Sequence, residues 1–308
     1  MKAVVVDNYN SIDGISIKEI DKPGVPPGEV RVKVGAAAVG FVDGLKVQGL
    51  YQTKDPLPFV PGTEFAGIVD AVADDVTTFK PDMPVIGMTR SGALAEYISV
   101  PSAALKNLPP QVPFEAGASF QANYLTGLYA LDARASLREG EILLVLGAAG
   151  GVGIAAVQIG KLMGARVIAA ASTAEKRAFA VRFGADHTID YTRTDWRDTL
   201  KELTGGHGPD VIFDPVGGEV ALQAFRSIAW RGRHLVVGFA SGTIPALAFN
   251  LPLLKGGALL GVLDLDSPEP ARFDQADAEG LGQAVQLLLA ASDMTRLVDA
   301  APSASNSP

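Results

Sequence analysis

The segment of this chain best suited to chemistry is a glycine-rich stretch that reads Gly-Ala-Ala-Gly-Gly-Val-Gly at 147–153. It follows a short apolar run at 142–146 and overlaps the start of an apolar run of helical period at 152–163. This order is typical of a buried strand that turns tightly into a helix, and the N–H groups at such a helix N-terminus bind phosphate oxygens. The segment therefore predicts a pyrophosphate site for a dinucleotide cofactor, and with it hydride chemistry.

The loop matches the spacing of the dinucleotide fingerprint at two of its three glycines. Ala148 occupies the first glycine position, and Gly150 and Gly153 occupy the second and third. Gly150 would let the backbone approach the pyrophosphate, and Gly153 would let the helix pack closely on its strand. A lone motif is weak evidence, and the alternative is a plain strand-to-helix turn. The alternation of strands and helices around the loop favours dinucleotide binding.

The next strand-to-helix turn carries the residues that would distinguish two cofactors. An NAD site commonly has an acidic residue about twenty positions after the glycine loop. This chain has Ala171-Ser172-Thr173 there, with Lys176 and Arg177 one turn into the next helix. A hydroxyl and a lysine would bind a 2′-phosphate that a carboxylate would repel, so NADPH is favoured over NADH. The alternative is that Ser172 only caps the helix and Lys176 is a solvated surface charge.

Composition limits the class of protein and its partners. The chain has 308 residues, of which 48% are hydrophobic and 19% charged, enough for a large core and two domains. The net charge is −8, without a basic block, which disfavours nucleic acid and anionic membranes as partners. Asp7 interrupts the N-terminal apolar run too early for a signal peptide, and glycines interrupt the long uncharged run at 142–160. We therefore expect a cytoplasmic protein.

The reactive side chains are few. There is no cysteine, and the three histidines are His187, His207 and His234. A tetrahedral zinc site would need histidines or carboxylates from distant segments, so no catalytic metal is expected. No Gly-x-Ser-x-Gly elbow of a serine hydrolase occurs. His187 and His234 lie on expected strands and are interpreted as structural residues.

The pattern of apolar residues predicts a fold of the α/β class. The first hundred residues contain short valine-rich runs between proline and glycine turns, which indicates a mostly β domain. From about Phe114, strand-like and helix-like runs alternate, which predicts a doubly wound parallel sheet with the glycine loop after its first strand. The expected strands are Ile142–Leu146, Arg166–Ala170, His187–Ile189, Val211–Phe213, His234–Val237 and Ala258–Val262. The expected helices are Val152–Met163, Ala174–Phe183, Trp196–Leu203 and Glu219–Ile228, with a further amphipathic helix near Leu281–Leu289 before a polar tail.

Several further motifs occur in a fixed order around this framework. They are Gly-Leu-Tyr-Gln at 49–52, Leu-Pro-Phe-Val-Pro-Gly-Thr-Glu-Phe-Ala-Gly at 57–67, Gly-Ala-Leu-Ala-Glu-Tyr at 92–97, Tyr-Leu-Thr-Gly at 124–127, Phe-Gly-Ala-Asp at 183–186 and Asp-Pro-Val-Gly-Gly at 214–218. From Met1 to about Val262 the chain resembles the zinc-free quinone oxidoreductases of the medium-chain dehydrogenase/reductase superfamily, the zeta-crystallin-like group. Zinc-binding relatives would have a histidine after Gly62, where this chain has Thr63.

The resemblance implies an organisation in three parts. Residues 1–118 would form a GroES-like substrate domain, residues 119–262 a Rossmann domain that binds NADPH, and residues 263–308 a shortened segment that returns toward the first domain. Relatives suggest a homodimer formed through the last sheet strand at Ala258–Val262. The polar stop at the C-terminus is earlier than in relatives, which carry another helix and a closing strand.

The resemblance also implies roles for particular residues. Thr126 would lie near the nicotinamide half of the cofactor, and Gly238, Phe239 and Ala240 would border the nicotinamide. The pyrophosphate would contact Ala149, Gly150, Gly151 and Val152, beside Gly153. The 2′-phosphate would lie among Ser172, Lys176 and Tyr191.

The acceptor site is expected around Tyr51 and Asp43. The Tyr51 phenol would hydrogen-bond an oxygen of the substrate, and the alternative is an aromatic ring packed under a glycine turn. Relatives usually have an asparagine three residues before the position of Asp43, and this chain has Gly40. In this family the proton can come from solvent, so that catalysis would rest on positioning the reduced nicotinamide against the acceptor.

The sequence thus favours an NADPH-dependent oxidoreductase that transfers hydride to small-molecule quinones or related conjugated carbonyls without a metal. An enoyl-thioester or enone reductase would use the same cofactor. A catalytically silent NADPH-binding protein is the alternative outside the enzyme class.

Overall fold

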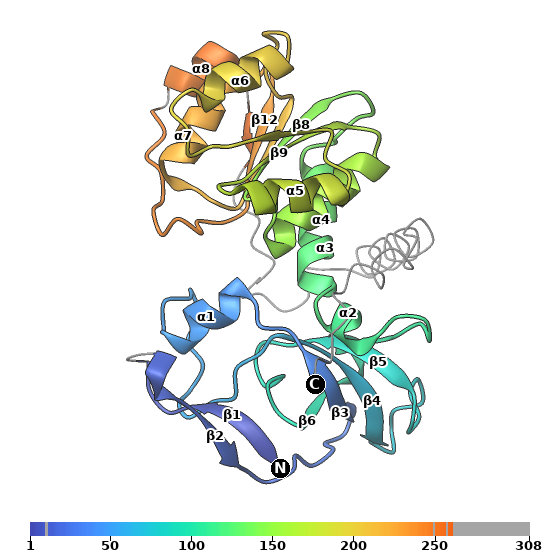
Figure 1. The fold of residues 1–308 in the computed structure, drawn as a ribbon. Coiled ribbons are helices and arrows are strands. Elements are labelled where there is room, and N and C mark those ends of the chain that lie inside the picture. The colour runs from blue at the N-terminus through green and yellow to red at the C-terminus, as the bar shows by residue number, and fades with distance from the viewer. Residues whose placement is uncertain (10–11, 249, 257, 261–308) are drawn as a thin grey trace, which may run out of the picture. The chain divides into compact units, whose positions relative to one another are not determined.

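The computed structural model describes residues 1–9, 12–248, 250–256 and 258–260. The chain divides into two compact units, Met1–Ala122 and Asn123–Pro308, which follow each other along the colour scale of Figure 1. The helix expected near Leu281–Leu289 and the rest of the segment at 263–308 lie outside the described residues.

An antiparallel sheet of five strands forms the body of the first unit, in the order β6-β3-β4-β5-β7. Its strands are β3 (Glu29–Ala37), β4 (Glu64–Val72), β5 (Pro84–Met88), β6 (Tyr97–Pro101) and β7 (Leu105–Asn107). The other elements are the antiparallel pair β1 (Lys2–Val6) and β2 (Ile15–Glu19), the helices α1 (Phe41–Val47) and α2 (Phe114–Ala118), and the 3₁₀ turns η1 (Ile12–Gly14) and η2 (Ser102–Ala104). The mostly β first domain that the sequence predicts is therefore present (Figure 1).

Alternation of side chains along the strands builds the core of this unit. Val30 and Val32 of β3 are fully buried, whereas Lys33 is exposed. Phe65 of β4 is also fully buried and pairs in register with Gly87 of β5. A Cβ at Gly87 would lie 2.3 Å from the Phe65 ring, so the ring fills the space that any larger residue would need.

A parallel sheet of six strands forms the second unit, in the order β10-β9-β8-β11-β12-β13. Its strands are β8 (Ile142–Leu146), β9 (Arg166–Ala170), β10 (His187–Ile189), β11 (Val211–Asp214), β12 (Arg233–Val236) and β13 (Ala258–Leu260). All five residues of β8 are buried, as expected for a central strand covered on both faces. The order reverses between β8 and β11, so the carboxyl ends of these two strands flank the switch point where doubly wound sheets bind ligands.

Helices connect the strands of this sheet. They are α4 (Gly151–Leu162), α5 (Ala174–Arg182), α6 (Trp196–Leu203), α7 (Gly218–Ser227) and α8 (Asn250–Lys255). The predicted doubly wound sheet is therefore present, and most of the predicted element ends agree with the structure within one residue. Gly164 and Gly184 follow α4 and α5 at φ values of 79° and 108°, the left-handed conformation that ends many helices.

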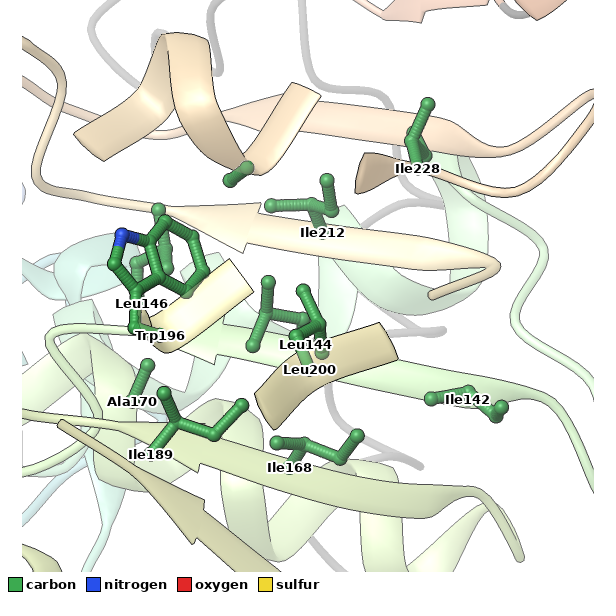
Figure 2. Packing of buried hydrophobic residues seen from close by; sticks show 11 residues of the cluster. Ile142, Leu144, Leu146, Ile168, Ala170, Ile189, Trp196, Leu200, Ile212 and Ile228 are labelled. Carbon is green, nitrogen blue, oxygen red and sulfur yellow. The ribbon is translucent and has the colours of Figure 1, made fainter. Parts of the chain in front are cut away.

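One large apolar cluster packs on the parallel sheet. Figure 2 shows Leu144 and Leu146 of β8 between Ile168 of β9 and Ile212 of β11, with α6 supplying Trp196. The indole N–H of Trp196 donates a hydrogen bond to Gln223 Oε1 at 2.6 Å. The one polar atom of this large ring is thus satisfied while the ring contributes apolar contact area.

Several short helical segments were not predicted from the sequence, among them α1, α2, α8, α3 (Gln121–Leu128) and the π-helix η3 (Tyr129–Arg134). Helix α1 is only seven residues long and contains Gly44, which weakens any helical pattern. Helices α3 and η3 form one continuous helical stretch. A π-turn shifts the helical register, which disturbs the 3.6-residue period on which sequence reasoning relies.

Truncating Leu144 tests the importance of the sheet core. Its side chain is fully buried in the cluster of Figure 2, so Leu144→Ala is expected to lower the free energy of unfolding by about 2–5 kcal/mol. Urea denaturation followed by circular dichroism measures the change. Leu162→Ala on α4 is the control, because Leu162 is 52% exposed and its truncation should cost less than about 0.5 kcal/mol. Equal losses in the two variants would contradict this view of the core.

Candidate active site

The glycine loop after β8 has a backbone conformation that glycine favours. Gly147 has a φ of 58°, in the left-handed region where a side chain is strained. The N–H of Gly150 donates to the carbonyl of Gly147 at 2.9 Å, and the N–H of Ala148 donates to the carbonyl of Ala170 on β9 at 3.2 Å. The loop is thus closed on itself and tied to the neighbouring strand.

Close packing of α4 on this loop requires glycine at one further position. A Cβ on Gly153 would lie only 2.3 Å from the carbonyl oxygen of Gly147. The atom in the way belongs to the backbone, so an added methyl group would force the loop or the helix to move. Gly153 is buried, whereas Gly150 and Gly151 are exposed, and Ala149 and Val152 are half-buried.

The N-terminus of α4 can receive an anion. Its N-cap is Gly150, which has no side chain to occupy the first N–H groups, and its first turn contains no acidic residue. Free N–H groups and the positive end of the helix dipole together bind phosphate. These residues therefore fit the pyrophosphate of a dinucleotide.

A second group of predicted residues lies at the carboxyl ends of β9 and β10, which pair in parallel. Ser172 follows β9 and is half-buried, Tyr191 follows β10 and is half-buried, and Lys176 in the first turn of α5 is exposed. The N-cap of α5 is Thr173, whose hydroxyl accepts a hydrogen bond from the N–H of Lys176 at 3.3 Å. The alternative in which Ser172 caps the helix is therefore wrong, and its hydroxyl is not used for capping.

Two charged neighbours of this group already have partners. Arg177 lies 2.9 Å from Asp190 Oδ2 and donates to the carbonyl of Ala171 at 3.1 Å. Hydrogen bonds from Thr192, followed by the charge of Arg177, hold the pKa of Asp190 below its usual range. Arg177 thus joins the ends of two strands, and Lys176 is the cation left exposed at this turn.

A third group forms where β11 and β12 end. The Oδ1 atom of Asp214 accepts the N–H groups of Val216 and Gly217, both at 2.9 Å. Its Oδ2 atom lies 2.9 Å from Nε2 of His234, a buried residue of β12. Within the described part of the chain Nδ1 of His234 has no hydrogen-bond partner. Because the Asp214 carboxylate accepts hydrogen bonds, Nε2 of His234 is the donor of this contact.

The loop expected to border the nicotinamide follows β12. Gly238 and Phe239 are half-buried, and Ala240 is exposed. The N–H of Gly238 donates to the carbonyl of Asp214 at 3.3 Å, and the N–H of Ala240 donates to the carbonyl of Pro215 at 3.0 Å. This loop is therefore held against the turn that follows β11.

Thr126 lies on α3, which packs on the glycine-loop helix. It is 8% exposed. A Cβ on the next residue, Gly127, would lie 2.9 Å from the side chain of Ile159 on α4. One turn earlier on α3, the side chain of Asn123 would lie 2.5 Å from a Cβ on Gly151. Asn123, which no local pattern marks in the sequence, therefore lies beside the first residue of α4.

The predicted acceptor residues of the first unit lie at opposite ends of α1. Asp43 is buried near the N-terminus, where its Oδ2 accepts the N–H of Gly40 at 2.8 Å. Burial raises the pKa of Asp43, and the Gly40 hydrogen bond and the Lys46 ammonium oppose that rise. Tyr51 follows the C-terminus of the helix and is half-buried. The structure therefore gives Asp43 a capping role at the N-terminus of α1, and the predicted roles of Asp43 and Tyr51 at the acceptor stay predictions.

Glu64 is a buried carboxyl group that sequence reasoning missed. It is 6% exposed at the start of β4, and its Oε1 accepts the N–H of Ala122 in the first turn of α3 at 2.7 Å. Burial raises its pKa to about 7, the nearby charge of Asp43 adds to the rise, and the N–H groups of Ala122 and Gln121 oppose it. An acidic residue directly before the apolar run Phe-Ala-Gly-Ile-Val is the signal that could have found it.

The described residues offer neither a metal site nor a membrane span. Among them, no group of three histidine, cysteine, aspartate or glutamate side chains is placed to hold a metal ion. In the same part of the chain, no helix is both long and apolar enough to cross a bilayer.

Comparison with known proteins places this geometry in a family. The profile of the Alcohol dehydrogenase GroES-like domain matches residues 26–110, and that of Zinc-binding dehydrogenase matches residues 151–277. Quinone oxidoreductase-like protein 2 of Mus musculus is 40% identical over 249 residues, which cover 80% of this chain and 71% of the relative. The chain belongs to the quinone oxidoreductase family of the medium-chain dehydrogenase/reductase superfamily.

Solved structures of this family have the same fold. The quinone oxidoreductase of Pseudomonas syringae superposes with a TM-score of 0.82 at 31% identity, covering 96% of this chain and 89% of that chain. The Escherichia coli quinone oxidoreductase, solved in complex with NADPH, gives a TM-score of 0.83 at 27% identity, covering 97% and 89%. The predicted combination of a GroES-like domain with a Rossmann sheet is confirmed, and the chain is an oxidoreductase of this superfamily.

Adding a methyl group at Gly153 tests the glycine loop of this quinone oxidoreductase family member. Because the new Cβ would collide with the Gly147 carbonyl, Gly153→Ala is expected to displace the N–H groups of the first turn of α4. The dissociation constant for NADPH should rise at least about tenfold, the cost of one charged hydrogen bond. Fluorescence titration measures it. Gly24→Ala is the control, since a Cβ there has no atom within 4 Å. Unchanged binding in a folded Gly153→Ala protein would contradict the proposed pyrophosphate site.

The buried carboxyl group of Glu64 predicts a pH dependence of stability. Its pKa is about 7 in the folded chain against a usual 4.5, so the folded state binds the proton more tightly than the unfolded state. The contribution of Glu64 is present at low pH and is lost as pH rises from about 4.5 to about 7, with a slope of up to about 1.4 kcal/mol per pH unit. Glu64→Gln should remove this part of the slope in urea denaturation at a series of pH values. Glu115→Gln, at an exposed position of α2, should leave the slope unchanged, and identical slopes in wild type and Glu64→Gln would refute the assignment.

Proposed function

We propose that the chain is an NADPH-dependent oxidoreductase that reduces quinones or related conjugated carbonyl compounds without a metal ion. The main support for the proposal is the arrangement of residues at the carboxyl ends of the parallel strands. There the N-terminus of α4, which has no side-chain cap, follows β8, and an exposed lysine lies at the turn after the neighbouring strand β9. The Escherichia coli relative solved with NADPH supports the choice of cofactor.

The second unit would bind and orient the cofactor. The N–H groups of the first turn of α4 would hold the pyrophosphate, and Lys176 with the Ser172 hydroxyl would neutralise and hydrogen-bond a 2′-phosphate. The turn after β11 and the loop at Gly238 would border the nicotinamide. Because backbone hydrogen bonds join these two segments, they would present one fixed surface to the ring.

The chemistry requires little from ionisable side chains. Bound NADPH supplies a hydride, which is two electrons and one proton, and a second proton from solvent converts a quinone to its hydroquinone. In a conjugated carbonyl the hydride would go to the β-carbon and the solvent proton to the α-carbon. The Tyr51 phenol would hydrogen-bond the carbonyl oxygen and hold the acceptor in position. Homodimer formation through β13 and a cytoplasmic location stay predictions.

The first test is NADPH oxidation by the purified chain with an ortho-quinone, with NADH in parallel and with enones and enoyl-CoA esters as competing acceptors. We expect faster turnover of the quinone, and a higher kcat/KM with NADPH than with NADH. Preference for enoyl-CoA esters would replace quinone reduction with thioester reduction. NADPH binding by a folded protein without turnover of any acceptor would refute the proposed activity and indicate a silent binding protein.

The cofactor preference is tested at Lys176. Lys176→Ala is expected to raise the KM for NADPH about tenfold, because one charged hydrogen bond is lost, while the KM for NADH changes less than about twofold. Arg182→Ala is the matched control, since it removes the same charge from the C-terminal end of α5. Equal effects of Lys176→Ala on the two cofactors would contradict the 2′-phosphate site.

A further inference from the structure

The segment that carries Tyr51 leaves α1 through a tightly specified turn. Gly49 has a φ of 66°, and its N–H donates to the carbonyl of Lys46 at 3.0 Å. The N–H of Leu50 donates to the carbonyl of Leu45 at 2.9 Å. A Cβ on Gly49 would lie 2.9 Å from the Tyr9 ring. The start of the segment at 49–55 is therefore fixed on one side.

The other end of the segment is fixed by a buried carboxylate. Asp55 is 7% exposed, and its Oδ1 accepts Nε of Arg90 at 3.0 Å and the hydroxyl of Ser91 at 3.5 Å. The backbone carbonyl of Asp55 accepts a hydrogen bond from the Tyr9 hydroxyl. Arg90 also donates to the carbonyl of Lys54 at 3.2 Å. Asp55 thus joins the segment to the turn after β5.

A buried ammonium lies between these two fixed points. Lys46 is 3% exposed, and its Nζ lies 3.5 Å from Oδ2 of Asp55 and 5.7 Å from the centre of the Tyr51 ring. The same Nζ donates a hydrogen bond to the carbonyl of Arg90. In the described residues no hydrogen bond reaches Asp55 Oδ2, so the Lys46 charge is what balances this atom.

A buried ion pair of this kind strongly restrains the position of the two side chains that form it. A charge that is removed from water is held only where an opposite charge and hydrogen-bond partners meet it, and removal of one member leaves the other uncompensated. An ammonium within 6 Å of an aromatic ring also attracts the face of that ring. One buried cation therefore acts on both the end of the segment and the aromatic ring within it.

We propose that the buried ion pair of Lys46 and Asp55 positions Tyr51, and thereby determines how tightly the chain binds its acceptor. This inference rests on the proposed function, in which Tyr51 lines the acceptor site. Lys46 and Asp55 are positioning residues that act through Tyr51 and do not touch the acceptor.

The kinetic test replaces Lys46 by methionine, which keeps the length and apolar body of the side chain. Lys46→Met is expected to raise the KM for the ortho-quinone about fivefold, while kcat and the dissociation constant for NADPH change less than about twofold. Lys54→Met is the matched control, because Lys54 is an exposed lysine of the same segment whose ammonium lies over Tyr9. An equal rise of KM in Lys54→Met would overturn the proposal in favour of a general charge effect.

A double-mutant cycle tests whether Lys46 acts through Tyr51. If it does, Lys46→Met should add less than about twofold to the KM of a Tyr51→Ala protein. Independent, multiplying effects of the two substitutions would overturn the proposal.

Hydrogen exchange separates this inference from the proposed activity, because it needs no acceptor. Amides of the peptide that covers residues 49–55 should exchange faster in Lys46→Met than in wild type, while peptides of β3 and β4 keep their rates. This result would support the positioning role even if the wild-type chain reduced no quinone. Unchanged exchange at 49–55 would overturn it, and faster exchange throughout the first unit would show a role in general stability instead.

Discussion

The close approach of Gly153 to the Gly147 carbonyl is the constraint on which the second unit depends. It allows α4 to start directly above the end of β8, and so directs the unpaired N–H groups of the helix toward the switch point of the sheet. Because the strands are parallel, the turns after β9, β11 and β12 end at the same edge. Most residues expected to bind the adenosine, the pyrophosphate and the nicotinamide come from the turns that follow these strands, and the shared edge brings those turns together.

The first unit buries several acidic side chains and few basic side chains that could balance their charge. Asp43, Asp55 and Glu64 are all less than a tenth exposed, and Lys46 is the lysine buried with them. Asp43 is stabilised by a backbone N–H at the start of α1, Glu64 by those at the start of α3, and Asp55 by Arg90 and Lys46. Backbone N–H groups at helix ends therefore act as partial positive charges in place of missing cations.

Sequence reasoning succeeded where a local pattern corresponds to a local structure. The apolar run at 142–146 and the glycines after it predict a strand, a turn and a helix, and the structure contains all three. It failed where the cause lies far away in the chain. Lys46 and Asp55 are nine residues apart and come together through the turn at Gly49 and the hydrogen bond from the Tyr9 hydroxyl to the Asp55 carbonyl. The backbone N–H that binds Glu64 comes from α3. Lysine in the apolar run of α1 was a visible signal, but its partner was not. The N-cap of α5 differs by one residue from the capping alternative, because the hydroxyls of Ser172 and Thr173 both suit that position and Thr173 occupies it.

The turn after β11 and the loop after β12 are joined by more than proximity. Asp214 accepts N–H groups of its own turn through the carboxylate and N–H groups of Val237 and Gly238 through its carbonyl, and His234 of β12 donates to the same carboxylate. The turn after β11 and the loop after β12 therefore form one hydrogen-bonded structural unit. An engineer who transplants the loop at 237–243 from a relative would need to transplant residues 214–218 and His234 with it, because either half alone would lose the hydrogen bonds that give it its shape.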